Sequence, residues 1–286
     1  DRLDSHIAGG GPPLVVLGES GIGKSALLAN WYLRYLEKHP EDFALIHFIG
    51  STPESADPVR LARRIMLELK RRFPDQLRDD VTVQRELIRD QLSSWLGMVS
   101  GLGRSVLLLD GLDQIEDRDA APDLGWLPVA CPPGCHVVLS TLPGRSLEAI
   151  RRRQWPEMTV ARLTVSERTD LLQRFLCQFG RRLSLERTNR IATAEQSAVP
   201  LFLRAMLDEL RQMGEHERLG ERIEHYLAAR DTVELYKRIV ERWEQDYGSD
   251  LVGESLGLIQ AARSGLSEAE LLDLLGRDRQ PLPRAQ

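Results

Sequence analysis

A glycine-rich octapeptide near the start of the chain constrains its fold more than any other feature. Residues 18–25 match the pattern G-x-x-x-x-G-K-[ST], and they follow the apolar run of residues 14–17. The segment after them places apolar side chains on one helical face, at Leu27, Leu28, Trp31 and Tyr35. Strand, loop and helix in this order are the context that a phosphate-binding loop requires. The sequence therefore predicts such a loop, the alternative being an ordinary glycine-rich turn.

The residue types in this loop suit the phosphates of a nucleotide. Glycines let the backbone turn sharply and bring N–H groups and the positive end of a helix to the anion. Lys24 would reach the β- and γ-phosphates, and the Ser25 hydroxyl would ligate Mg²⁺. The residues expected to bind ATP or ADP here are Gly18, Glu19, Ser20, Gly21, Ile22, Gly23, Lys24, Ser25 and Ala26.

Length, composition and charge limit the classes of protein to which the chain can belong. A chain of 286 residues can hold one large domain or up to three small ones. Its hydrophobic fraction of 42% and charged fraction of 28% are typical of soluble globular proteins. The net charge of −5 provides no general attraction to nucleic acid or acidic membranes. No apolar run is long enough to predict a membrane span.

The cysteines indicate the compartment. Cys131, Cys135 and Cys177 are an odd set, and Cys131 and Cys135 have no second ligand pair downstream to complete a zinc site. We therefore expect a reducing, cytoplasmic location and no structural metal. A redox role for Cys131 and Cys135 is the alternative.

The first half of the chain alternates strand-like and helix-like segments. Further strands are predicted at 43–49, 105–110, 136–141 and 158–161. Asp57 predicts a helix cap before Pro58, and residues 83–99 predict an amphipathic helix with Leu87 on its apolar face. Residues 1–11 end in glycines and predict a flexible lead-in. Strands separated by helices indicate an α/β fold with a parallel sheet and right-handed crossovers.

From about residue 163 the pattern becomes helical throughout. Ser166 is predicted to cap one helix and Pro200 to open another. Further helices are expected over 217–229 and 233–247, and Ser267 to Glu270 form a capping-box pattern. The second half therefore predicts an all-α region.

Asp110 ends the apolar strand 105–110 and is the second group that we expect at the phosphate site. At the carboxyl ends of a parallel sheet it would emerge beside the phosphate loop, where it could hold Mg²⁺ together with Ser25. One strand and two helices lie between the two motifs. That arrangement looks like the P-loop ATPases with an extra strand between the motif strands and the sheet order 5-1-4-3-2. Nucleotide kinases and GTPases are less favoured.

Asp110 is followed by Gly111, Leu112 and Asp113, and this run resembles the Walker B motif of NACHT-type STAND ATPases, which are signal-transduction switches. The segments 201–211 and 265–272 are similar to the helical subdomain and the start of the winged-helix region in the nephrocystin and telomerase-associated-protein branch. The resemblance implies a P-loop domain at 1–162, a helical domain at 163–230 and a partial winged helix at 231–286. It also implies that Pro200 contacts the nucleotide.

Several positions depart from the pattern of that family. Gln114 stands where many members carry Glu and cannot take a proton, so Lys24, Asp110 and Asp113 are the expected catalytic residues, with Asp113 as base or water-positioning group. Leu142 replaces the sensor arginine, which leaves Thr141 and Arg145 as sensor candidates. Pro200 follows Ala198 and Val199 without the usual glycine. These departures weaken the expectation of fast hydrolysis and leave binding untouched.

The resemblance implies an ATP/ADP-binding switch whose nucleotide state controls domain opening and nucleotide-dependent homo-oligomerisation, with slow Mg²⁺-dependent hydrolysis. Its trigger would be sensed by regions outside this chain, and no membrane or nucleic-acid partner is expected. One alternative is an origin-recognition-type, ATP-dependent DNA-binding protein, for which residues 151–153 and 181–182 are the candidate basic patches. Another is a scaffold that holds nucleotide without catalysis.

Overall fold

The computed structural model describes residues 2–212, 218–262 and 265–276. Its contacts divide the chain into two compact units, with the division between Ala161 and Arg162. Each unit has a hydrophobic core of its own, so the two are described separately. No helix among the described residues is both long and apolar enough to cross a membrane.

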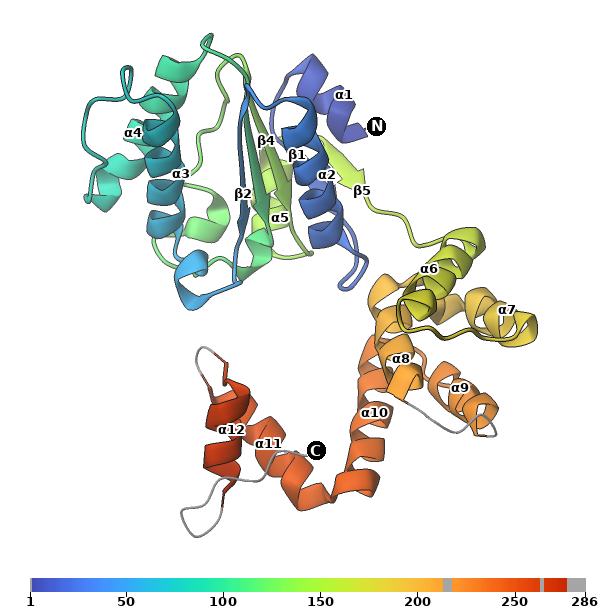
Figure 1. Ribbon diagram of the computed structural model, residues 1–286. Helices are drawn as coiled ribbons and strands as arrows, with labels where there is room; N and C mark the ends of the chain where they lie inside the picture. Colours follow the sequence, from blue (N-terminus) through green and yellow to red (C-terminus); the bar gives the residue numbers. More distant parts are fainter. Residues whose placement is uncertain (1, 213–217, 263–264, 277–286) are drawn as a thin grey trace. The chain divides into compact units, whose positions relative to one another are not determined.

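The first unit is built around a five-stranded sheet (Figure 1). The strands are β1 (Leu14–Leu17), β2 (Phe43–Phe48), β3 (Ser105–Asp110), β4 (Cys135–Ser140) and β5 (Glu157–Thr159). They lie in the order β2-β3-β4-β1-β5, and every neighbouring pair is parallel. The predicted order 5-1-4-3-2 is therefore confirmed, and the carboxyl ends of β1 and β3 open on the same edge.

Helices cover both faces of this sheet. They are α1 (Arg2–Gly9), α2 (Lys24–Lys38), α3 (Pro58–Arg72), α4 (Arg85–Val99) and α5 (Arg145–Arg152), with short 3₁₀ turns η1 (Pro53–Ala56), η2 (Leu112–Gln114) and η3 (Ala121–Asp123). Residues of α1 and α2 pack against one face, and residues of α3, α4 and α5 against the other (Figure 1). A sheet buried on both sides explains why its strands are continuous apolar runs.

Successive strand residues point to opposite faces, so each central strand contributes to two cores. Val15 belongs to the buried cluster that includes residues of α3, α4 and α5, whereas its neighbour Val16 belongs to the cluster that includes residues of α1 and α2, and both are fully buried. In β3, Leu107 likewise belongs to the first of these clusters and Leu108 to the second. This burial fixes the strands that carry the phosphate loop and Asp110.

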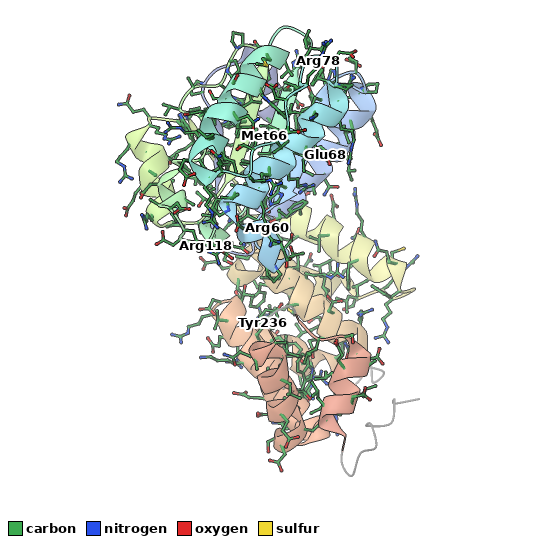
Figure 2. The ribbon with its side chains drawn as sticks, turned by 90° about the vertical axis from the view of Figure 1, so that its left-hand side faces the viewer. Arg60, Met66, Glu68, Arg78, Arg118 and Tyr236 are labelled. Atoms are coloured by element: carbon green, nitrogen blue, oxygen red, sulfur yellow. The ribbon has the colours of Figure 1, made fainter. Side chains whose placement is uncertain are left out.

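The helix α3 begins where its sequence predicts. The Asp57 carboxylate accepts the backbone N–H groups of Val59 and Arg60 at 2.8 and 3.0 Å and so caps the first turn. Met66 is completely buried, while Arg60, in the first turn of the helix, is exposed (Figure 2). The cap and the apolar face together position the helix.

Two predictions about this unit are wrong. Residues 2–9 form α1 rather than a flexible lead-in, because Leu3 and Ile7 lie one turn apart and are both buried, and Trp31 Nε1 donates to Asp4 at 3.0 Å. In α4 the side chain of Leu87 is exposed, and its neighbour Ile88 is buried instead. A shift of one residue along a helix turns the side chain by about 100°, which the apolar pattern alone did not resolve.

The second unit is helical. Its elements are α6 (Val165–Gln178), α7 (Leu185–Thr193), η4 (Glu195–Ala198), α8 (Pro200–Gln212), α9 (Leu219–Leu227), α10 (Thr232–Tyr247), α11 (Ser249–Ala261) and α12 (Glu268–Leu275). Thr164, not Ser166, caps α6, because its hydroxyl accepts the Glu167 N–H while Glu167 bonds back to Thr164. Pro200 opens α8 as predicted.

One core joins helices α6 to α10. Leu235 and Ile239 of α10 belong to the same buried cluster as residues of α6, α7, α8 and α9. The winged-helix assignment of 231–286 and the boundary at residue 230 stay predictions. Residues 213–217 and 277–286, which include parts of two predicted segments, lie outside the described residues.

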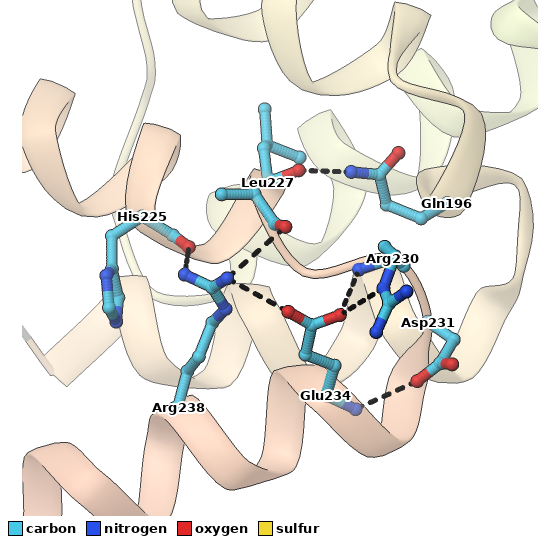
Figure 3. A network of polar contacts seen from close by, with 8 residues as sticks. Gln196, His225, Leu227, Arg230, Asp231, Glu234 and Arg238 are labelled. Atoms are coloured by element: carbon cyan, nitrogen blue, oxygen red, sulfur yellow. Dashed lines mark hydrogen bonds and ion pairs between the residues drawn. The ribbon is translucent and has the colours of Figure 1, made fainter.

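The junction between α9 and α10 is held by polar contacts (Figure 3). Arg238 donates to the carbonyls of His225 and Ala228 at 3.0 and 3.3 Å and pairs with Glu234. Gln196 Nε2 donates to the Leu227 carbonyl and ties η4 to the same end of α9. These bonds satisfy carbonyl groups that the end of α9 leaves without helical partners.

Candidate functional site

The predicted phosphate loop lies between β1 and α2. Gly21 and Gly23 have φ angles of +78° and +95°, in the region that residues with a Cβ rarely adopt. The loop closes on itself through the Ile22 N–H, which donates to the Glu19 carbonyl at 3.3 Å. Ser25 is exposed at the first turn of α2. The loop therefore presents its helix start to solvent, as an anion site requires.

Lys24 is the first residue of α2, and its ammonium group is folded into the loop. Its Nζ donates to the carbonyls of Gly18 and Glu19 at 2.8 and 3.2 Å. Partial burial lowers the pKa of Lys24, and the nearby carboxylates of Asp113, Asp110 and Glu19 oppose that shift. Two acidic groups that are distant in the sequence therefore lie around the lysine of the phosphate loop.

Asp110 ends β3 and is 6% exposed. The Ser140 hydroxyl, at the end of the neighbouring β4, donates to its Oδ1. The same hydroxyl accepts the Gly111 N–H at 2.9 Å. Among the described residues no other hydrogen bond to this carboxylate is found, so its Oδ2 is left for a ligand.

Asp113 lies on the turn after β3 and contacts the loop that follows β4. The Leu142 N–H donates to its Oδ1 at 2.9 Å. Leu142 stands where the resemblance led us to look for an arginine, but its backbone holds the predicted base candidate. A carboxylate that accepts a backbone N–H at one oxygen can still accept a proton or orient water at the other.

Gln114 packs against a glycine of the loop after β2. A Cβ added to Gly50 would stand 2.0 Å from Gln114 Oε1, and Gly50 has a φ of +81°. The Ile49 N–H, one residue earlier, donates to the Asp110 carbonyl at 2.8 Å. Gln114 therefore braces the ends of β2 and β3 against each other.

The two sensor candidates have local partners. Arg145 pairs with Asp117 at 2.8 Å and Asp123 at 2.5 Å, and these contacts raise its pKa, mainly through the hydrogen bond to Asp123. The Thr141 side chain is fully buried and donates to the Leu142 carbonyl at 3.1 Å. Their sensor roles stay predictions.

Pro200 lies in the second unit, at the start of α8. It lines an open groove of about 550 Å³ between α6 and α8, together with Phe175 and Arg204. The Arg204 guanidinium lies 4.6 Å from the centre of the Phe175 ring and also pairs with Asp208. A contact between Pro200 and nucleotide stays a prediction.

The residues present fit a magnesium ion. Mg²⁺ prefers hard oxygen ligands, keeps several waters, and binds proteins through one or two carboxylates and the phosphates. Asp110 offers one oxygen that accepts no hydrogen bond from the part of the chain that the structure describes, and the exposed Ser25 offers a hydroxyl on the phosphate loop. When bound, the ion would neutralise charge on the β- and γ-phosphates.

The cysteines offer no disulfide. Cys131, Cys135 and Cys177 are all free. A hydrogen bond with Cys131, together with burial, raises the pKa of the Cys135 thiol, and the same hydrogen bond lowers the pKa of the Cys131 thiol. A redox role for Cys131 and Cys135 stays a prediction.

Two residues of the site were not predicted from the sequence. Ser140 was assigned only to a strand, and Gly50 was not considered. Ser140 could have been predicted from the sheet order, because in the order 5-1-4-3-2 a hydroxyl at the end of strand 4 must lie beside the carboxylate that ends strand 3. No feature of the sequence identifies Gly50, because its requirement for a positive φ depends on the path of the loop.

The sheet order, the phosphate loop and the carboxylate at the end of β3 define a P-loop NTPase. A NACHT domain model matches residues 12–178, which is more than half of the chain. The chain therefore belongs to the NACHT family. The predicted family resemblance and fold class are confirmed.

Known proteins resemble the chain over most of its length. It is 30% identical over 304 residues to a TPR repeat-containing protein of Dictyostelium discoideum, covering 92% of this chain and 18% of that protein. It is 28% identical over 273 residues to telomerase protein component 1 of Mus musculus, covering 91% and 10%. The Walker-type ATPase of Pyrococcus abyssi has the same fold, with a TM-score of 0.52, 12% identity, and coverage of 96% and 85%. The chain thus spans less than a fifth of the length of the Dictyostelium discoideum and Mus musculus relatives.

Proposed function

We propose that the chain is the ATP/ADP-binding switch of a larger signalling protein. The observation that carries this proposal is the phosphate loop whose Lys24 lies beside Asp110 and Asp113. ATP and ADP differ in the γ-phosphate, and only a ligand that contacts two states differently can shift their balance. Lys24, Asp110 and the loop would contact that phosphate and its Mg²⁺, so the site can distinguish the two nucleotides.

The proposed switch acts between the two units, whose opening would follow nucleotide state, with homo-oligomerisation as its output. The trigger would be sensed outside this chain. The TPR repeats named in one relative are the kind of region that could sense it. Light scattering with ADP and with a non-hydrolysable ATP analogue tests this directly. The same mass with both nucleotides would oppose nucleotide-linked assembly in this chain.

Binding at the predicted site is tested by Lys24→Ala. Because the ammonium group reaches the phosphates in this motif, the variant should lose most of its affinity for a fluorescent ATP analogue. Lys38→Ala is the matched control, because Lys38 is an exposed lysine at the other end of the same helix. Equal affinity of Lys24→Ala and wild type would show that the site is assigned wrongly.

Slow hydrolysis is the second part of the proposal. Of the carboxylates around Lys24, Asp113 has the largest electrostatic effect on the lysine, and the Leu142 N–H holds Asp113 in place, so it is our candidate for orienting water. Asp113→Asn should abolish phosphate release while nucleotide binding persists, whereas Asp119→Asn, at an exposed aspartate, should change neither. Unchanged turnover in Asp113→Asn would remove Asp113 from the mechanism. Absence of turnover in the wild type would favour the non-catalytic scaffold.

A DNA-binding function has little support in the basic segment 151–153. Arg151 pairs with Glu157 at 3.0 Å, and Arg152 pairs with Asp123 at 3.0 Å. Arg153 donates to the Leu124 carbonyl at 2.7 Å. Guanidinium groups with carboxylate or carbonyl partners are poorly placed to neutralise phosphates, so we do not propose nucleic acid as a partner.

A further inference from the structure

Ser140, at the end of β4, has a fully buried side chain that is hydrogen-bonded to the Asp110 carboxylate. Its backbone is the partner of Val16 on one side, in the strand that leads into the phosphate loop. On the other side Leu139 is the partner of Leu109, so Ser140 comes opposite Asp110. The side chain is 0% exposed. Its hydroxyl is therefore fixed between the two strands that carry the nucleotide motifs.

The two hydrogen bonds of this hydroxyl set its direction. A serine has one hydroxyl proton and two lone pairs. The Gly111 N–H occupies a lone pair at 2.9 Å, and the proton goes to Asp110 Oδ1. Because Gly111 follows Asp110 directly, Ser140 clamps both the carboxylate and the backbone that turns away from it.

This clamp restricts the Asp110 carboxylate. A carboxylate with one oxygen held cannot turn about its Cβ–Cγ bond without breaking that hydrogen bond, and a broken bond at a buried site leaves polar groups without partners. Oδ1 is therefore occupied, and Oδ2 is the oxygen offered to a cation. Outer hydrogen bonds of this kind orient metal ligands in proteins generally.

We propose that Ser140 is a positioning residue for Mg²⁺, holding Asp110 in the orientation that leaves Oδ2 for the ion. The inference rests on the proposed nucleotide site and goes beyond it, because it assigns a role to a residue that would act through Asp110 rather than as a ligand of nucleotide or metal. Its consequence is specific. Loss of the hydroxyl weakens the effect of Mg²⁺ on nucleotide affinity and leaves metal-free nucleotide binding unchanged.

Two substitutions of equal shape isolate the hydroxyl. Ser140→Thr keeps it, and Ser140→Val replaces it by a methyl group while adding nearly the same volume. Any packing strain in the buried site is therefore common to both variants. Ser105→Ala is the control for removing a buried serine hydroxyl, because Ser105 lies in β3, is 2% exposed, and its hydroxyl has no hydrogen-bond partner among the described residues.

The measurement is the affinity for a fluorescent ADP analogue in EDTA and over a series of Mg²⁺ concentrations, with melting temperatures as a check of folding. We expect Ser140→Val to require about tenfold more Mg²⁺, or higher, for the same enhancement of affinity. Its affinity in EDTA should equal that of wild type, and Ser140→Thr and Ser105→Ala should retain the wild-type Mg²⁺ dependence.

The outcomes separate this inference from the proposed function. Wild type that binds no nucleotide under either condition would refute both. Wild type that binds nucleotide and responds to Mg²⁺, with Ser140→Val responding equally, would overturn only the role of Ser140. Equal loss of Mg²⁺ response in Ser140→Thr and Ser140→Val, or equal loss of affinity with and without Mg²⁺, would assign Ser140 a packing role instead.

Discussion

The contact between Gly50 and Gln114 gives a sharp test of how the strand ends are held. Gly50 has a φ of +81°, and an added Cβ would lie 2.0 Å from Gln114 Oε1 and 3.0 Å from Gln114 Cβ. An alanine in this backbone region costs about 1–2 kcal/mol. Displacing the exposed Gln114 side chain from its rotamer adds about 0.5–1.5 kcal/mol.

We therefore expect Gly50→Ala to destabilise the first unit by about 2 kcal/mol, which lowers its melting temperature by about 4–8 °C for a unit of this size. Tryptophan fluorescence is a suitable assay, because Trp31, Trp95, Trp126 and Trp155 all lie in this unit. Adding Gln114→Ala should recover the part of the loss that comes from the side-chain clash and not the part that comes from φ.

Gly97→Ala is the matched control. Gly97 lies within α4, and no atom lies within 4 Å of an added Cβ. A glycine in the middle of a helix is less favourable than alanine by about 0.5–1 kcal/mol, so this variant should be more stable than wild type. If Gly50→Ala melted at or above the wild-type temperature, the reasoning from backbone conformation and clash would be refuted.

Three further changes test other parts of the structure. Arg242→Met removes the partner at 2.8 Å from Glu209, which is 5% exposed, and should destabilise the second unit by about 3–5 kcal/mol in urea. Burial lowers the pKa of His6 and of His136 below the usual 6.5. The unfolded chain then binds more protons, so the first unit should lose stability in thermal melts as pH falls below that value. Asp57→Ala removes the cap of α3 and should lower the stability of the first unit by about 1 kcal/mol in thermal melts.

Each of these has its own control. Arg230→Met breaks an exposed pair with Glu234 and should change stability by no more than about 1 kcal/mol; a loss equal to that of Arg242→Met would contradict the argument from burial. Replacing His6 and His136 by Gln should reduce the loss of stability in acid, and an unchanged pH profile would exclude them as its source. Asp57→Asn should keep the cap, because its side-chain oxygen still accepts the N–H groups.

The parts of the site that could be predicted are those whose chemistry is local in sequence. The phosphate loop from Gly18 to Ser25, the strand before it and the helix after it are contiguous, and Asp110 closes an uninterrupted apolar run. Caps such as Asp57 depend on side chains within three residues. Where two local signals competed, as at Thr164 and Ser166, the one with a reciprocal partner at Glu167 formed the cap.

The flexible lead-in was a different kind of error. Glycines at 9–11 indicate a break, and they do follow α1, but the helix before them forms because Leu3, Ile7 and Asp4 find partners on α2 and the sheet. An eight-residue helix is marginal on its own, and packing stabilises it. Sequence patterns describe a segment and omit what lies beside it.

The amino-acid sequence alone determined that the chain has a nucleotide phosphate loop, a carboxylate strand and an α/β order. Only the tertiary structure decided that Ser140 holds Asp110, that the Leu142 backbone holds Asp113, and that Gln114 packs on Gly50. Each of these contacts joins residues from different strands or loops. Their geometry depends on strand register and side-chain rotamers, which are set by the packing of the whole sheet between its two layers of helices.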